Sequence, residues 1–307
     1  MPRHLTSLND LTPAELHEIL ATAGDLKAKY RVGDRPVLFP GCVLAQLFEK
    51  PSLRTRNSFE AAMVNLGGSG IFLTMAEAGL DGRESLADVA TVLSSYSDVI
   101  TLRTFSQQLI HDFAEFSQCP VINALSDDRH PCQALTDLLT IQETAGSLDG
   151  AHLVFVGDGN NVARSLALAS AMSGLRFTLA VPDGFELPNH FISDLADQFP
   201  GARVSQMSDP VGAVSDADFV YTDVWASMGQ EEEAERRRKA FADYQVNAEL
   251  MNAAPKSARF MHDLPAKRGL EVTDDVMDGS QSIVFQQAEN RMHLARGLFA
   301  WLLRSAQ

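Results

Sequence analysis

Two hydroxyls and two arginines stand close together in the segment Ser52-Leu53-Arg54-Thr55-Arg56. They fall at the predicted start of a helix with Ser52 as its N-cap, because a strand-like apolar run ends at Pro51 just before them. Free backbone N–H groups and the positive end of the helix dipole point outward there. Ser52, Arg54 and Thr55 add donors that suit a phosphate. The segment predicts an anion site; a capped surface helix with two solvated arginines is the alternative.

Arg103, His130 and Gln133 form a second group of polar residues beside predicted strands. Arg103 ends a strand predicted over 98–103, and parallel strands bring such ends to one edge of a sheet, where the helix start at Ser52 also lies. His130 and Gln133 are one helical turn apart at the start of a predicted helix, so both side chains can reach one space. A lone histidine is more often a satisfied surface or core residue, and that alternative stays open.

The second half of the chain carries a glycine-rich turn after the strand predicted over 153–156. The run Gly157-Asp158-Gly159-Asn160-Asn161 leads into a helix. It nearly matches the dinucleotide-binding fingerprint, but Val162 stands in the place of the third glycine, so a nicotinamide cofactor is not favoured. The amide groups of Asn160 and Asn161 are better suited to the carboxylate of a substrate. Further polar residues follow later strands, at 223–231 and 262–265.

The elements that must position these residues are predicted from apolar patterns. Strands alternate with helices, which indicates an α/β fold with parallel sheets. Residues 76–83 are glycine-rich and are predicted as a loop, and 146–150 as the boundary between domains. Strands are predicted over 43–48, 69–74, 98–103, 120–123, 153–156, 177–181, 217–221 and 260–262, and helices over 5–31, 53–66, 84–95, 109–117, 131–144 and 283–303.

The composition sets broad limits on function. The 307 residues are enough for two domains, and a net charge of −15 argues against nucleic acid and anionic membranes as partners. No apolar run is long enough for a membrane span or a signal peptide. Three scattered cysteines, Cys42, Cys119 and Cys132, suggest reduced thiols and a cytoplasmic setting. The eight histidines have no metal-ligand spacing, so we expect no metal.

Taken in order, the polar motifs resemble those of the aspartate and ornithine carbamoyltransferases, and of the ornithine enzymes in particular. The motifs are Ser52-x-Arg54-Thr55-Arg56, Arg103, His130-Pro-Cys-Gln133, Asp158-Gly-Asn-Asn161, Asp223-Val-Trp-x-Ser-Met-Gly229, His262-x-Leu-Pro265 and Gln287-Ala-Glu-Asn-Arg291. The resemblance implies two doubly wound α/β domains bridged by two helices. Residues 1–145 would bind carbamoyl phosphate, with the helix over 283–307 packing back on them, and 146–282 would bind the amino acid.

The resemblance also implies a role for each matching residue. Carbamoyl phosphate would be bound by Ser52, Leu53, Arg54, Thr55, Arg103, His130, Gln133, Leu264 and Arg291. Ornithine would be bound by Asn161, Asp223, Ser227, Met228, Asp263 and Leu264. The catalytic residues would be Arg103, His130, Gln133, Asp263 and Arg291. The products would be citrulline and phosphate, with no metal or cofactor, and the family likeness implies a homotrimer.

Three positions depart from the family pattern. Leu53 stands where threonine is usual, although its backbone N–H remains. The loop around Gly79 lacks a polar side chain that a neighbouring subunit usually contributes, and Arg83 is a possible replacement. Asp263 replaces the cysteine of His-Cys-Leu-Pro, beside the reacting amine. Asp263 can therefore act as a general base, hold the amine as an unreactive ammonium, or turn away to pair with Lys267 or Arg268.

These departures leave three functions open. The first is ornithine carbamoyltransferase. The second is carbamoyl transfer to a related amine, a change of substrate that Asp263, in place of the family cysteine, would indicate. The third is a non-catalytic paralogue that binds ligands. The motif Asp223-x-Trp-x-Ser-Met-Gly favours an α-amino acid over a plain diamine, and the intact Arg54, Arg103 and His130 argue against the paralogue.

Overall fold

The computed structural model describes residues 2–226 and 233–304, and the chain divides into two compact units. Unit 1 comprises Met1–Leu139 and Glu289–Gln307, and unit 2 comprises Thr140–Ala288. Both divisions fall inside helices, namely α5 (Pro131–Ala145) and α12 (Val284–Arg304). The chain therefore passes between the units only within these two helices.

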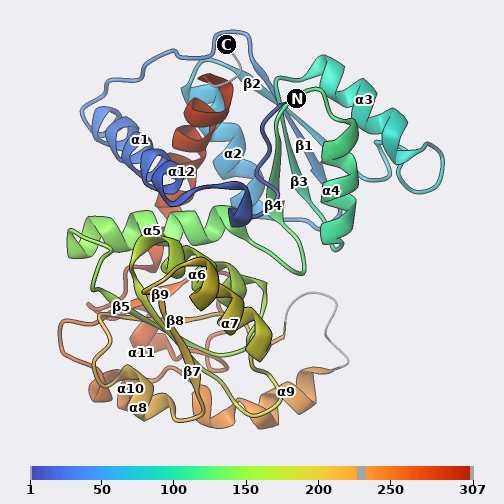
Figure 1. The fold of residues 1–307 in the computed structure, drawn as a ribbon. Coiled ribbons are helices and arrows are strands. Elements are labelled where there is room, and N and C mark those ends of the chain that lie inside the picture. The colour runs from blue at the N-terminus through green and yellow to red at the C-terminus, as the bar shows by residue number, and fades with distance from the viewer. Residues whose placement is uncertain (1, 227–232, 305–307) are drawn as a thin grey trace. The chain divides into compact units, whose positions relative to one another are not determined.

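Unit 1 contains a four-stranded parallel sheet in the order β2-β1-β3-β4. The order reverses between β1 and β3, and ligands of doubly wound sheets bind beyond the carboxyl ends of the strands at such a point. Helices α3 and α4 lie together on one face of the sheet, and α2 lies on the other (Figure 1). The elements are α1 (Pro13–Arg31), β1 (Val43–Phe48), α2 (Leu53–Asn65), β2 (Ser69–Thr74), α3 (Leu86–Tyr96), β3 (Val99–Arg103), α4 (Gln107–Phe116) and β4 (Val121–Leu125).

Unit 2 contains a five-stranded parallel sheet in the order β7-β6-β5-β8-β9. Its reversal point lies between β5 and β8. The elements are β5 (His152–Val156), α6 (Asn161–Ser173), β6 (Arg176–Ala180), α7 (Asn189–Gln198), β7 (Arg203–Met207), α8 (Pro210–Val214), β8 (Phe219–Thr222), α9 (Ala234–Ala240), α10 (Ala248–Ala253), β9 (Arg259–His262) and α11 (Asp274–Met277). The predicted fold class of two parallel-sheet α/β domains is confirmed.

The main error of the sequence prediction lies at the N-terminus, where the expected helix over 5–31 is too long. Leu5 instead bridges to Ile122 next to β4. A 3₁₀ turn, Leu8–Asp10, follows with Ser7 as its cap, and α1 begins only after a second capping box built on Thr12. Each cap satisfies the free N–H groups of a new helix start, so the segment cannot continue as one helix.

Strand β7 and the short helices of unit 2 were not predicted from the sequence. Residues 203–207 alternate between exposed and half-buried positions, because β7 is an edge strand. Such a strand has no continuous apolar run, and its polar face resembles that of a loop. Helices α8, α10 and α11 span only four to six residues each, which is too short for a periodic pattern.

Candidate active site

The first helix turn of α2 forms as predicted, with Ser52 as the N-cap. The Thr55 N–H donates to Ser52 Oγ at 3.2 Å, and Ser52 Oγ donates to Thr55 Oγ1 at 3.0 Å. The side chain of Leu53 is 74% exposed. A threonine hydroxyl is therefore missing from the surface of this turn, whereas the backbone N–H groups that a helix start directs at anions are retained.

Two guanidinium groups converge on the hydroxyl of Thr55. Arg103 Nη1 donates to Thr55 Oγ1 at 3.3 Å, and Arg291 Nη2 donates to the same oxygen at 2.8 Å. Arg103 is the last residue of β3 and lies opposite Phe48 of β1, so the sheet register delivers it to the start of α2. Thr55 is 1% exposed. Two cations around a neutral, buried hydroxyl favour an anionic ligand.

Gln133 and His130 complete what we call the arginine cluster: Ser52, Thr55, Arg103, His130, Gln133 and Arg291, together with Arg54, which precedes Thr55 in the first turn of α2. Gln133 Oε1 accepts a hydrogen bond from Arg291 Nη1 at 2.5 Å, and its Nε2 donates to Asp137 Oδ1 at 2.8 Å. Asp137 thereby fixes which end of the Gln133 amide faces the arginine. The sequence interpretation missed Asp137, although its place one turn after Gln133 was a usable signal.

His130 is a neutral member of the arginine cluster. Burial lowers the pKa of His130 well below its usual range, and the nearby charges of Arg291 and Arg103 lower it further. A neutral imidazole still offers one N–H hydrogen-bond donor. It lacks the second, acidic proton that a general acid would transfer at neutral pH. His130 is therefore suited to donate a hydrogen bond to an oxygen and unsuited to act as a general acid.

In unit 2 the turn after β5 caps α6 with Asn160. Asn160 Oδ1 accepts from the N–H groups of Val162 and Ala163, each at 3.0 Å, and its Nδ2 donates to Asp223 Oδ2 at 2.9 Å. Asp223 directly follows β8, the neighbour of β5, so the sheet order brings the two residues together. Asn161, the predicted ligand residue, is the first residue of α6. Asn160, whose amide was expected together with that of Asn161 to suit a substrate carboxylate, instead donates to Asp223.

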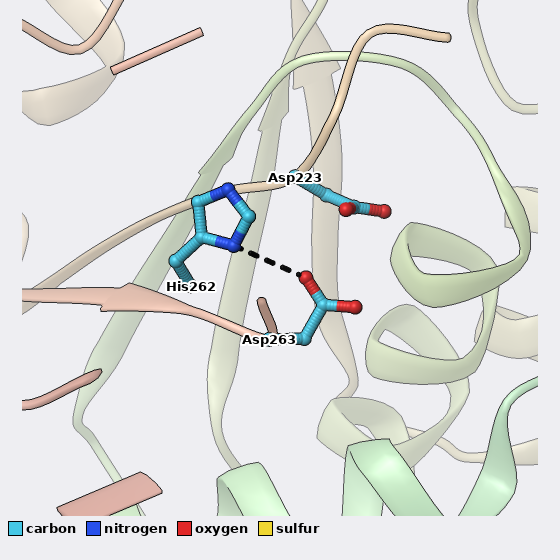
Figure 2. A group of neighbouring side chains, drawn as sticks. All are labelled: Asp223, His262 and Asp263. Carbon is cyan, nitrogen blue, oxygen red and sulfur yellow. Dashed lines mark ion pairs between the residues drawn. The ribbon is translucent and has the colours of Figure 1, made fainter. Parts of the chain in front are cut away.

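Asp223, His262 and Asp263 form what we call the carboxylate cluster. One ligand atom from each lies within 4.8 Å of the other two. Figure 2 shows both carboxyl groups beside the imidazole, with Asp263 joined to His262 by an ion-pair contact. Burial raises the pKa of Asp223 well above its usual range, and the charge of Asp263 raises it further. Two ionised carboxylates this close in a buried site repel each other. A proton or a cation between them removes that repulsion.

Both ring nitrogens of His262 are occupied. Nε2 lies 3.2 Å from Glu271 Oε1, and Nδ1 accepts the backbone N–H of Leu264 at 2.9 Å. Burial acts to lower the pKa of His262, but hydrogen bonding to Asp263 and Glu271 raises it to about 9. The Leu264 bond needs a lone pair on Nδ1, and Asp263 Oδ1 is farther away, at 3.4 Å. The Leu264 contact fixes the lone pair of a neutral ring on Nδ1, whereas the raised pKa favours a charged ring with a proton on each nitrogen. Neither form leaves a lone pair for a metal.

The loop after β9 differs from one of the sequence alternatives. Arg268 pairs with Asp274 at 2.8 Å and with Asp278 at 2.6 Å, so it is not the partner of Asp263. Asp263 instead faces Asp223 and His262. Leu264 has a positive φ of 61°, which its N–H bond to His262 supports. Ser227 and Met228, two predicted ornithine ligands, lie outside the described residues.

Two buried polar contacts that the sequence interpretation missed hold the carboxylate cluster in place. Glu271, which is fully buried, receives the Lys267 N–H at 2.5 Å as well as facing His262. Arg237 of α9 pairs with Asp158 at 2.5 Å and donates to the Trp225 carbonyl at 3.0 Å. The second contact anchors the segment after β8 to the turn after β5. Arg237 belongs to a run of charged residues in α9, but its own side chain is buried.

Comparison with known proteins identifies the family. A model described as aspartate/ornithine carbamoyltransferase, carbamoyl-P binding domain, matches residues 3–143, and one described as the Asp/Orn binding domain of the same family matches residues 149–302. The ornithine carbamoyltransferase of Pyrococcus abyssi is 47% identical over 98% of this chain and 96% of its own length. The ornithine carbamoyltransferase of Acidothermus cellulolyticus is 48% identical over 100% of this chain and 98% of its own length.

The solved structures agree with the sequence comparison. The structure of ornithine carbamoyltransferase from Pyrococcus furiosus superposes with a TM-score of 0.95 at 45% identity, covering 99% of this chain and 98% of the other. The fold and its two reversal points thus define a two-domain α/β transferase. This chain belongs to the aspartate/ornithine carbamoyltransferase family.

Proposed function

We propose that this protein transfers the carbamoyl group of carbamoyl phosphate to the side-chain amine of L-ornithine, giving L-citrulline and phosphate. The observation that carries the choice of amino acid is the carboxylate cluster, in which Asp223 and Asp263 lie within 4.8 Å. Two carboxylates attract a substrate with an extra ammonium group and repel one with an extra carboxylate. Within this family, the cluster therefore favours ornithine over aspartate.

We assign carbamoyl phosphate to the arginine cluster of unit 1. The phosphate group would be held by Ser52, Arg54 and Thr55 with the N–H groups at the start of α2, among them that of Leu53. Arg103 and Arg291, which already converge on Thr55, would balance the remaining charge. Gln133, whose Oε1 is directed toward Arg291, would accept a hydrogen bond from the carbamoyl NH₂ group.

The reaction is attack by the lone pair of a neutral amine on the carbonyl carbon, followed by departure of phosphate. Negative charge develops on the carbonyl oxygen, where Arg103, Thr55 and His130 would donate hydrogen bonds as in an oxyanion hole. His130 suits this role because its lowered pKa keeps it neutral. It donates a hydrogen bond and leaves protonation to other groups. Alignment of the two substrates and exclusion of water would supply much of the remaining rate.

We assign ornithine to unit 2. Asn161, at the start of α6, would bind the α-carboxylate, since the helix N-terminus favours an anion. Asp223 would bind the α-ammonium group, together with Ser227 and the backbone of Met228. Asp263 and Leu264 would lie nearest the reacting amine, with the backbone of Leu264 also contacting the carbamoyl group.

A substrate comparison tests the proposal. Carbamoyl transfer should be measured with L-ornithine, L-lysine, putrescine and L-aspartate at a fixed carbamoyl phosphate concentration, following the carbamoylated product and released phosphate. We expect L-ornithine to give the highest kcat/KM, and putrescine and L-aspartate to give at least about 100-fold lower values. Equal turnover of putrescine would assign the site to a plain diamine. No turnover with any of the four amines would mark the chain as a non-catalytic relative.

We also propose a homotrimer with active sites at the subunit borders, and a cytoplasmic setting. The support is family likeness and the turn-rich loop at 75–84, in which Gly79 has a positive φ of 80° and Arg83 is exposed. All three cysteines are free thiols. Among the described residues no helix combines the length and apolar character needed to cross a membrane. Light scattering that gives a stable, active monomer would contradict the trimer.

A further inference from the structure

Asp263 presents a buried carboxylate oxygen that has no hydrogen-bond donor among the described residues. This atom is Oδ1, and the side chain as a whole is 12% exposed. The nearest ring nitrogen, His262 Nδ1, already accepts the N–H of Leu264. A buried acceptor without a donor costs free energy. That cost is removed when a donor enters with the substrate.

Asp223 differs from Asp263 in this respect. Its Oδ2 accepts from Asn160 Nδ2 at 2.9 Å, and its Oδ1 accepts from the N–H of Val224 at 2.6 Å. Both oxygens therefore already have protein donors, whereas Asp263 keeps lone pairs open. Of the two carboxyl groups, Asp263 is therefore the one with a buried oxygen open to a donor of the substrate.

The two carboxyl groups lie close enough to face the two amino groups of one ornithine, Asp223 the α-ammonium group and Asp263 the reacting amine. One oxygen of each lies within 4.8 Å of the other. A divalent cation fits less well, because both ring nitrogens of His262 are occupied. Two carboxyl groups alone make a poor ligand set for such an ion.

We propose that Asp263 is the general base of the reaction, resting on the function proposed above. The ionised carboxylate of Asp263 takes one proton from the δ-ammonium group of ornithine. A carboxylic acid and a neutral amine result, and the amine lone pair is freed for attack on the carbonyl carbon. The step exchanges one N–H bond for one O–H bond and needs no further reactant.

Burial favours this proton transfer. The carboxyl group of Asp223 faces Asp263 across the cluster. The ring of His262 lies between Asp263 and the buried Glu271, and Lys267 on the same loop points to the Ala226 carbonyl at 3.5 Å. Loss of water raises a carboxyl pKa and lowers an amine pKa, so a dry site favours the neutral pair over the ion pair.

The test compares two amines that differ in whether a base is needed. The δ-ammonium group of L-ornithine must lose a proton before attack. Its aminooxy isostere, L-canaline, has a terminal amine that is already neutral at pH 7. Wild type, Asp263→Asn and Asp263→Cys should be assayed with both amines from pH 6.5 to 9. Asp197→Asn, which removes an exposed carboxylate of α7 in the same unit, is the matched control.

For ornithine at pH 7, we expect Asp263→Asn to lower kcat/KM by about 100-fold, while canaline changes by less than about threefold. Without the base, log kcat/KM for ornithine should rise with pH at a slope near 1, against a nearly flat wild-type profile. Asp263→Cys should recover activity only as its thiol ionises, near pH 8.5. Asp197→Asn should match wild type with both amines.

Three outcomes would overturn the assignment. Equal losses with both amines would mean that Asp263 supports binding or structure without acting as a base. Superimposable ornithine profiles of wild type and Asp263→Asn would make Asp263 a bystander. Absence of turnover by wild type with either amine would overturn the proposed function itself, and the role of Asp263 with it.

Discussion

The arginine cluster of unit 1 and the carboxylate cluster of unit 2 are built on the same backbone feature. In each unit a strand next to the reversal point of a parallel sheet leads into a capped helix, Ser52 capping α2 and Asn160 capping α6. The neighbouring strand then adds a charged residue at its carboxyl end. In unit 1 that residue is Arg103, at the end of β3, and in unit 2 it is Asp223, just after β8.

The sign of that added charge decides what each helix start can bind. At α2 the arginines reinforce the positive helix end, so the site suits a phosphate with two charges. At α6 the carboxyl group of Asp223 accepts from the cap residue Asn160 and places negative charge next to the positive helix end. The second site can therefore hold a ligand that carries both a carboxylate and an ammonium group. A shared scaffold thus carries opposite charges at its two helix starts through a few side chains.

The largest expected effect tests the arginine cluster. Arg54→Ala should weaken carbamoyl phosphate binding by about 10³-fold, because two charge-assisted hydrogen bonds to phosphate contribute roughly 4 kcal/mol. Calorimetry measures the affinity, and circular dichroism checks that the fold is intact. Arg54→Lys keeps the positive charge but not the planar guanidinium group. Its affinity for carbamoyl phosphate should lie between those of wild type and Arg54→Ala. An affinity unchanged in Arg54→Ala would remove this residue from the site.

The second prediction tests the carboxylate cluster. Asp223→Asn should raise the KM for ornithine by about 100-fold, through loss of a buried charge partner, while leaving carbamoyl phosphate affinity unchanged.

Asp223→Asn should also raise Tm at pH 7. The raised pKa of Asp223 means that the folded state binds the proton more tightly, so wild-type stability falls as pH rises above the ordinary aspartate pKa.

Two measurements check this prediction. Thermal denaturation should show the Tm gain of Asp223→Asn at pH 7, at about 2–4 °C for each kcal/mol, and the gain should shrink as pH approaches 4. Steady-state kinetics should show the rise in KM for ornithine. A Tm below that of wild type at neutral pH would mean that Asp223 is held ionised by the protein.

The smallest expected effect concerns His130. The lowered pKa of His130 means that the unfolded chain binds a proton more readily than the folded one. Folded-state stability is therefore lost as pH falls below the ordinary histidine pKa of about 6.5. His130→Asn should flatten the Tm profile between pH 5 and 7 relative to wild type, whereas substitution of the exposed His190 by Asn should not. An unchanged slope would mean that His130 is protonated in the folded protein.

The sequence alone determined the local structure of both clusters. Ser52 and Thr12 are N-caps as expected, and β1, α2 and Arg103 at the end of β3 lie where their patterns placed them. These features depend on residues a few positions apart, so a short stretch of sequence encodes them. The parallel α/β class was predictable for the same reason, since the alternation of strand and helix is itself a local pattern.

Only the tertiary structure decided which side chains meet. Arg291 and Thr55 are 236 positions apart, and their contact depends on where α12 packs against the start of α2. The pairing of Asn160 with Asp223, the contact of Glu271 with His262 and the open oxygen of Asp263 likewise depend on strand order and loop path. Sheet order is set by the burial of many apolar residues at once, so no single motif reports it. The sequence supplied the polar motifs, and the fold determined their partners.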